Sequence, residues 1–152
     1  MTGPTTPPAD DEWAARRRDG AAEQAARLQR AKDSESTRAR TLLADFVRTA
    51  QERGIATTEL KARALNGRSL YRTGLTGWYL RRNATIAVDE QGEFYVMTAP
   101  TSIVSRLHGV TLTPSDPPMI PGAGGRDGES MPLPEMLALR LAAAEAGESW
   151  TR

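Results

Sequence analysis

The chain has no cysteine and only one histidine among its 152 residues. Without cysteine it forms no disulfide, no thiolate nucleophile and no zinc–sulfur site. A single histidine, His108, supplies too few nitrogen ligands for a transition-metal centre. We therefore expect no metal, no cofactor and no catalytic residue.

Long apolar runs and aromatic side chains are also scarce. Nowhere do 18 consecutive apolar residues occur, so no membrane-spanning helix is expected. The first residues, MTGPTTPPADDEW, have neither a basic start nor an apolar stretch, which argues against a signal peptide. Hydrophobic residues make up 39% and aromatics 5%, so part of the chain should bury little surface. We expect a cytoplasmic protein.

The net charge of +1 argues against a dominant role in polyanion binding, although the charge is unevenly distributed. Residues 1–54 carry 10 Lys/Arg and 9 Asp/Glu, residues 55–113 carry 7 and 4, and residues 114–152 carry 3 and 6. The middle segment has the largest basic excess, and Arg81 with Arg82 is its densest point.

The amino-terminal third predicts a tail followed by helix. Three prolines in residues 1–10 indicate a disordered tail. Residues 11–35 are rich in Ala, Arg, Glu and Gln but poor in larger apolar groups, which predicts an extended polar helix. An apolar stripe over residues 42–50 then predicts a helix that packs on a core. Because residues 34–37 have weaker helix propensity, a break there is favoured over one continuous helix, although both stay open.

Alternating apolar and polar residues predict strands in the middle of the chain. The runs Leu75–Arg82, Thr85–Val88 and Phe94–Thr98 are joined by short turns, so they should pair antiparallel as a β-meander. Two further strands are expected, one over Ile55–Leu65 and a short one over Val110–Thr113.

A short helix over Ile103–His108 and a closing helix over Leu133–Ala146 complete the pattern. The sequence thus predicts an α+β fold, a four- to five-stranded antiparallel sheet with the long N-terminal helix and the C-terminal helix packed on one face. Residues 36–146 should form this single domain, and residues 147–152 a tail. The expected core comprises Phe46, Trp78, Leu80, Ile86, Val88, Phe94, Val96, Leu112 and Leu137.

Three groups of residues could suggest a functional site, but each has a simpler structural explanation. His108 ends a predicted helix, where a cation near the helix dipole explains it better than a general base. The glycine-rich loop Gly122–Gly128 lacks the Lys-Ser or Lys-Thr pair of a phosphate loop and is interpreted as a connector. Asp89 and Glu90 lie in an expected exposed turn and receive no catalytic role.

One strand face carries both aromatic and basic residues. Tyr79 and Arg81 should share a face, with Tyr95 across from them, as in platforms that stack the bases of single-stranded RNA or DNA. A cross-strand aromatic–Arg pair that stabilises the sheet is the alternative. The candidate binding residues are Tyr79, Arg81, Arg82, Tyr95, Arg63 and Arg72.

The runs GLTGWYLRRN and FYVMTAP, followed by GVTLTPSDPP and GGRDGES before a Leu-rich helix, together resemble a family of short, uncharacterised cytoplasmic proteins from actinobacteria. The resemblance covers about residues 54–146. It implies one folded unit and carries over no activity, cofactor or catalytic residue.

No nucleophile with a base, no metal ligands and no cofactor fingerprint are recognisable, so the sequence predicts a protein that is not an enzyme. The favoured hypothesis is a small non-catalytic binding module that engages a protein partner, or associates with itself, through the N-terminal helix. The alternative is single-stranded nucleic-acid binding across the meander.

Overall fold

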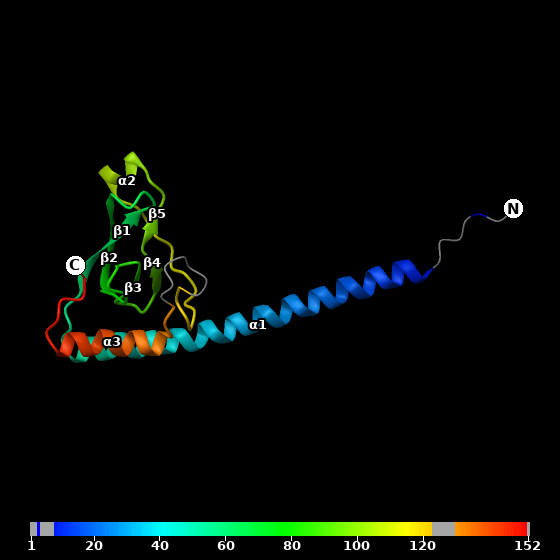
Figure 1. Cartoon of the computed structure of the whole chain (residues 1–152), viewed down its shortest axis with the longest axis horizontal. Helices are drawn as coiled ribbons and strands as arrows, with labels where there is room; N and C mark the ends of the chain where they lie inside the picture. The colour runs from blue at the N-terminus through cyan, green and yellow to red at the C-terminus, as the bar shows by residue number, and fades with distance from the viewer. Residues whose placement is uncertain (1–2, 4–7, 123–129, 152) are drawn as a thin grey trace. The chain divides into compact units, whose positions relative to one another are not determined.

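The computed structural model describes residue 3, residues 8–122 and residues 130–151. Most of the expected disordered tail 1–10 and nearly all of the Gly122–Gly128 loop lie outside the described residues. The described residues form an α+β fold, as the sequence predicts (Figure 1). Its elements are α1 (Pro8–Glu52), β1 (Thr58–Ala64), β2 (Leu70–Tyr79), β3 (Ile86–Asp89), β4 (Phe94–Val96), β5 (Thr98–Ala99), α2 (Ile103–His108) and α3 (Leu133–Glu145).

The sheet is mixed rather than purely antiparallel, which corrects one part of the prediction. Its strand order is β4-β3-β2-β1-β5, and the first three pairings are antiparallel. The last pairing, between β1 and β5, is parallel. Only Met97 separates β4 from β5, and its N–H donates to the Thr85 carbonyl while its own carbonyl accepts from the Arg63 N–H. One continuous stretch of chain therefore supplies both edge strands of the sheet.

The expected strand Val110–Thr113 does not form. The Val110 N–H donates one hydrogen bond to the Arg72 carbonyl at 2.8 Å, and Gly109 has a φ of 80°. The side chains of Val110 and Leu112 instead pack onto buried residues of the sheet. This segment covers a face of the sheet, and burial of its apolar side chains there stabilises the arrangement.

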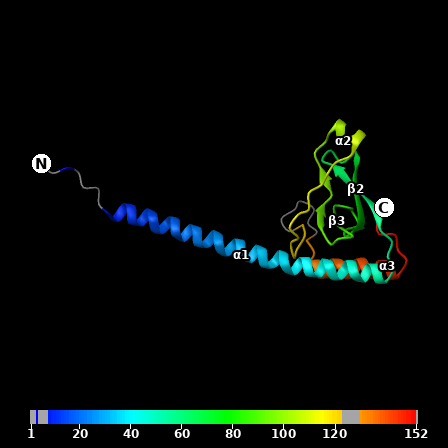
Figure 2. The same ribbon diagram turned by 180° about the vertical axis from the view of Figure 1, so that it is seen from behind.

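The main core lies between one face of the sheet and two helices. Trp78 packs edge-on against Phe46 of α1, with ring centroids 6.1 Å apart and planes at 89°. Figures 1 and 2 show α3 alongside the C-terminal part of α1, on the same side of the strands. Eight of the nine expected core residues are buried or half-buried, but Val96 is 46% exposed because β4 turns it outward.

Contacts divide the chain into two compact units, Met1–Ser34 and Glu35–Arg152, while α1 runs without interruption from Pro8 to Glu52. The break favoured at residues 34–37 is therefore absent from the backbone. Tertiary packing begins there instead, because the Glu35 carboxylate accepts a hydrogen bond from the Met119 N–H at 2.9 Å. No helix in the described part of the chain is long and apolar enough to cross a membrane.

The second face of the sheet carries its own small cores. Leu60, Tyr95 and Met97 are buried there, with Tyr79 and Leu112 packed against them. Tyr95 is 5% exposed, and its hydroxyl donates to the Asp89 carboxylate at 3.1 Å. Asp89 was expected to be exposed but is buried. Its side chain also accepts from the N–H groups of Gln91 and Glu93 in the β3–β4 turn, and these bonds offset the cost of burying the carboxylate.

We expect Tyr95 to make stability fall in alkali. Burial, and then Asp89 beside it, raises the pKa of Tyr95 to about 12, whereas an unfolded tyrosine has a pKa of about 10. The unfolded chain therefore loses this proton first, and stability present below pH 10 should be lost as the pH rises towards 12. Urea unfolding across this range should show a shallower decline for Tyr95→Phe than for the wild type. Parallel declines for the two proteins would contradict the assignment.

Candidate functional site

The turn between β2 and β3 places two arginines at the end of the sheet. The Asn83 carboxamide oxygen accepts from the Thr85 N–H at 3.2 Å and from the Thr85 hydroxyl at 2.7 Å, which closes the turn locally. Ala84 completes the reversal with a φ of 58° and donates its N–H to the Arg81 carbonyl. Arg81 and Arg82 are consequently held at a fixed place on the domain.

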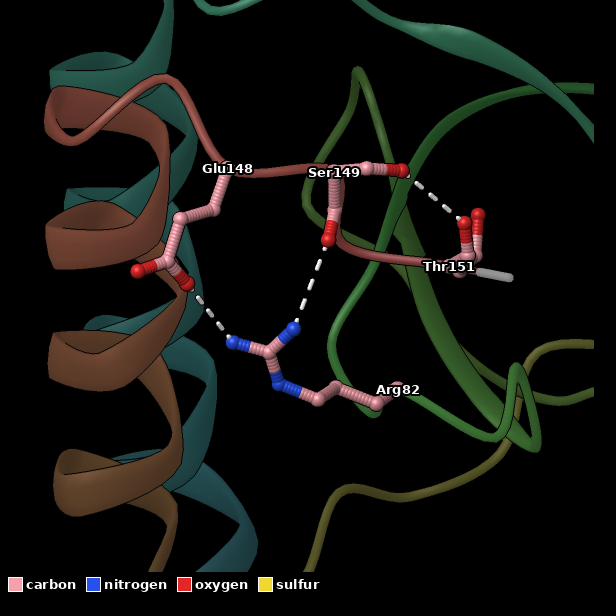
Figure 3. A network of polar contacts seen from close by, with 4 residues as sticks. All are labelled: Arg82, Glu148, Ser149 and Thr151. Atoms are coloured by element: carbon pink, nitrogen blue, oxygen red, sulfur yellow. Dashed lines mark hydrogen bonds and ion pairs between the residues drawn. The ribbon is translucent and has the colours of Figure 1, made fainter.

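Arg82 contacts Glu148 and Ser149, which follow α3 (Figure 3). One η nitrogen donates to the Glu148 carboxylate at 3.0 Å, and the other donates to the Ser149 carbonyl at 3.3 Å. The Ser149 hydroxyl in turn donates to the Thr151 carbonyl at 3.1 Å. Glu148 and Ser149, within the expected tail 147–152, therefore contribute contacts to the domain, while residue 152 lies outside the described residues.

Trp150 lies next to two guanidinium groups. The Arg82 guanidinium carbon is 4.5 Å from the ring centroid and that of Arg140 is 5.3 Å away, both within range of cation–π attraction. Arg140 comes from α3, and its ε nitrogen donates to the Tyr79 carbonyl at 3.1 Å. Burial, and then the like charge of Arg82, lowers the pKa of Arg140. We call Arg82, Arg140 and Trp150 the Arg–Trp cluster.

A cavity of about 550 Å³ opens beside the Arg–Trp cluster. Its apolar walls come from Leu80, Met131, Met136, Leu139 and Trp150. Its polar walls come from Arg81, Arg82, Asn83 and Ser130. Among these described lining residues Ser130 has the one hydroxyl and no side chain is a base, so the lining offers donors and apolar surface for binding.

The structure separates the six candidate binding residues into three places. Tyr79 and Tyr95 lie on the second face of the sheet, where the Tyr79 hydroxyl accepts from the Lys61 N–H at 2.7 Å. Arg63 and Arg72 are exposed on the opposite face, because their strand neighbours Ala62 and Tyr71 point into the second face. Arg81 and Arg82 lie at the turn, where the Arg81 side chain donates to the Pro121 carbonyl at 3.2 Å.

His108 is exposed at the end of α2, with no carboxylate within hydrogen-bonding distance among the described residues. No group of three or more His, Asp or Glu side chains suited to a metal ion occurs in the part of the chain that the structure describes.

The Arg–Trp cluster contains two residues that sequence reasoning missed. Arg140 is the single charged residue in the run LALRLAAA, and a lone charge in an apolar helix is a signal that it has a partner. Trp150 stands in the polar segment that follows α3, and a large aromatic ring there is a signal that the segment packs against the domain.

Comparisons with protein-family models, with curated proteins and with solved structures found no match to this chain. The resemblance to short actinobacterial proteins therefore stays a prediction from the sequence.

The other candidate surface is the helix of the N-terminal unit. Its described residues 9–34 are exposed except for the partly covered Ala14, and Trp13 and Leu28 are 59% and 56% exposed. Side chains stabilise the helix locally, since the Arg16 guanidinium is 3.4 Å from the Glu12 carboxylate and that of Arg17 is 4.5 Å from the Trp13 ring centroid.

Proposed function

We propose that this chain is a non-catalytic cytoplasmic interaction module and that residues 9–34 of α1 bind a second protein helix. The observation that carries the proposal is the exposure of this segment, which includes a tryptophan and a leucine that water would otherwise surround. In proteins, most helices gain their stability by burying one apolar face rather than from helix propensity alone.

The face available for burial is a narrow stripe. At 100° per residue, Ala14, Ala21, Ala25 and Leu28 fall within a sector of about 60° on one side of the helix. Three alanines in this sector would let another helix approach closely, since the distance between helix axes depends on the side chains at the contact. The stripe therefore favours a helical partner over a flat surface.

The charges on this segment favour a second copy of the chain as that partner. Residues 9–21 carry four Asp/Glu and three Lys/Arg, with Asp10, Asp11 and Glu12 at one end. Residues 22–34 carry two Asp/Glu and three Lys/Arg, and the basic group Arg27, Arg30 and Lys32 lies near the other end. An antiparallel pair of these helices would bring each acidic end beside the partner's basic group, whereas a parallel pair would bring like charges together. Unlike charges across a helix pair set its orientation.

We predict that Leu28→Glu weakens dimerisation. The new carboxylate would enter the stripe, so the dissociation constant should rise about tenfold or more, which corresponds to roughly 1.4 kcal/mol. Sedimentation equilibrium at low salt over a concentration series measures this. Leu107→Glu is the matched control, because Leu107 is 77% exposed on α2.

A monomer at every concentration would rule out the second copy. Affinity capture with the wild-type chain and with Leu28→Glu would then test for another protein, recovered only by the wild type. If both measurements fail, the helix is not a binding surface and the proposed function is wrong.

Binding of single-stranded nucleic acid remains the alternative function. It would depend on exposed basic residues alone, without the stacking surface expected from Tyr79 and Tyr95. The rings of Tyr79 and Tyr95 pack inside the second face, so bases could not stack on them without opening the sheet. Lys61, Arg63 and Arg72 are exposed on the other face and supply only phosphate contacts. An electrophoretic shift with short oligomers, lost in Arg63→Gln with Arg72→Gln, would revive this alternative.

A further inference from the structure

The turn between β1 and β2 and the short helix α2 lie together at one end of the domain. Figures 1 and 2 show α2 at the end of the sheet away from α3. The Asn66 N–H, in the turn, donates to the Thr101 hydroxyl at 3.3 Å. The Ser102 N–H donates to the Tyr71 hydroxyl of β2 at 2.9 Å. We call residues 61–72 together with α2 the hairpin–α2 end.

Helix α2 has an apolar side that faces away from the domain. None of its six residues is buried, and Ile103 and Leu107 are both 77% exposed while Val104 is 65% exposed. At 100° per residue these three side chains fall within a sector of about 100°, and Arg106 borders that sector. Ser105, on the opposite side of the helix, is its one partly covered residue.

The hairpin adds two more apolar side chains. Leu65 is 73% exposed and Leu70 is 58% exposed. Half of the ten large apolar side chains that the described residues expose therefore belong to this end of the domain. Exposed apolar groups that gather in one place mark a surface that binds something, whereas scattered ones need no explanation.

The same end carries positive charge that no carboxylate balances. Residues 60–73 and 97–113 contain no Asp or Glu, and their five basic residues are all exposed: Lys61, Arg63, Arg68, Arg72 and Arg106. None of the five forms an ion pair with a carboxylate in the described part of the chain. Glu59, the one acidic residue of β1 and β2, lies opposite Thr76, away from the turn. This end should therefore attract a negatively charged surface.

An anionic lipid bilayer matches both properties. Its headgroups attract Lys and Arg and repel carboxylates, and the boundary with the acyl chains accepts Leu, Ile and Val side chains. A fluid bilayer also receives protruding side chains without a matching shape, whereas a protein partner has to supply a complementary surface. Nucleic-acid phosphates would suit the basic residues, but they would leave the apolar side chains in water.

We propose that the hairpin–α2 end binds the surface of an anionic phospholipid bilayer. Ile103, Val104 and Leu107 enter the boundary between headgroups and acyl chains, and the five basic residues contact the headgroups. The surface belongs to the unit Glu35–Arg152, so it does not depend on the proposed role of the N-terminal helix.

Sedimentation of the full-length chain with vesicles tests the proposal. The two vesicle types are phosphatidylcholine alone and phosphatidylcholine with about 30% phosphatidylserine. We expect at least about tenfold tighter binding to the vesicles with phosphatidylserine, because each Lys or Arg near an anionic surface adds to the attraction. The difference should shrink as salt screens the charges.

Single substitutions separate the two contributions. Leu107→Glu should weaken binding to the anionic vesicles about tenfold or more, and Arg106→Gln about fivefold. Arg38→Gln, an exposed arginine on α1, is the matched control and should leave binding unchanged. Dimerisation measured without lipid should not respond to Leu107→Glu, so a failure of this proposal is distinguishable from a failure of the proposed function.

The absence of cysteine allows a dye at one chosen position. Leu107→Cys labelled with the polarity-sensitive dye NBD should brighten and shift its emission to shorter wavelength when the anionic vesicles are added, because the dye leaves water. The same dye on Thr41→Cys, an exposed position on α1, should not change. This measurement holds even if Leu107→Glu does not fold, which circular dichroism shows.

The proposal is overturned if the wild-type chain does not sediment with anionic vesicles at about 1 mM lipid. It is equally overturned if both vesicle types bind alike, if Arg38→Gln weakens binding as much as Arg106→Gln, or if the dye at position 107 stays in water. Binding to a short single-stranded oligonucleotide or to polyglutamate, but not to vesicles, would assign this end to nucleic acid or to an acidic protein segment instead.

Discussion

Replacing Trp78 by alanine should lower the free energy of unfolding by about 3–5 kcal/mol, a large part of the 5–15 kcal/mol typical of a domain. Trp78 is 1% exposed, and it fills the space between the sheet and α1 by packing edge-on against Phe46. Its indole N–H also satisfies the Ile55 carbonyl, which the truncation would leave without its donor. Urea unfolding followed by circular dichroism measures the loss.

Trp13→Ala is the matched control for this prediction. It removes the same side chain from a position that is 59% exposed, so stability should change by no more than about 0.5 kcal/mol. Trp78→Phe, which keeps a ring but loses the donor, should fall between the two. A Trp78→Ala protein as stable as Trp13→Ala would show that the main core does not depend on this ring.

Gly77→Ala should be the most damaging change of a single methyl group in the sheet. A Cβ at Gly77 would lie 2.1 Å from the Val88 carbonyl oxygen and 2.7 Å from the Asp89 Cα. Both are backbone atoms of β3, so no side-chain rotation relieves the overlap and the β2–β3 pairing must open. We expect a loss of about 3 kcal/mol or more, or failure to fold, measured by the same urea unfolding.

Gly20→Ala is the corresponding control, because a Cβ there meets nothing within 4 Å inside a helix. Alanine has the higher helix propensity, so this change should stabilise the helix by about 0.5–1 kcal/mol. If Gly77→Ala is as stable as Gly20→Ala, β2 and β3 do not approach each other as closely at Gly77 as described.

The α+β fold was predictable wherever the spacing of apolar residues indicates which side of an element is buried. The alternation around Trp78 and Leu80 predicts a strand with one buried face, and the apolar stripe that contains Phe46 predicts a helix with one buried face. The parallel pairing of β1 with β5 was not predictable, because β5 has only two residues, too few to show the alternation of apolar and polar residues that marks a strand. For α1 the sequence left a continuous helix and a broken one both open and favoured the break; the helix is continuous because the good helix formers on both sides outweigh a short stretch of weak propensity.

The candidate site was harder to predict because its members come together only through the tertiary fold. Arg82 and Glu148 are separated by 66 positions, and no local pattern marks them as partners. Tyr79 and Tyr95 were placed correctly on one face, but strand alternation cannot tell whether a face is open to solvent. Val110 and Leu112 cover that face from a segment that the sequence suggested was a strand.

The short strands at the margins of the sheet bear on how the protein avoids aggregation. An exposed strand edge is a template to which another chain can add, and long flat edges are the most susceptible. Here β4 has three residues and β5 two, and the outer side of β4 is already engaged by Ser115, whose N–H donates to the Phe94 carbonyl at 2.8 Å. Neither margin offers the length that strand addition needs, so fibril formation should require prior unfolding of the domain.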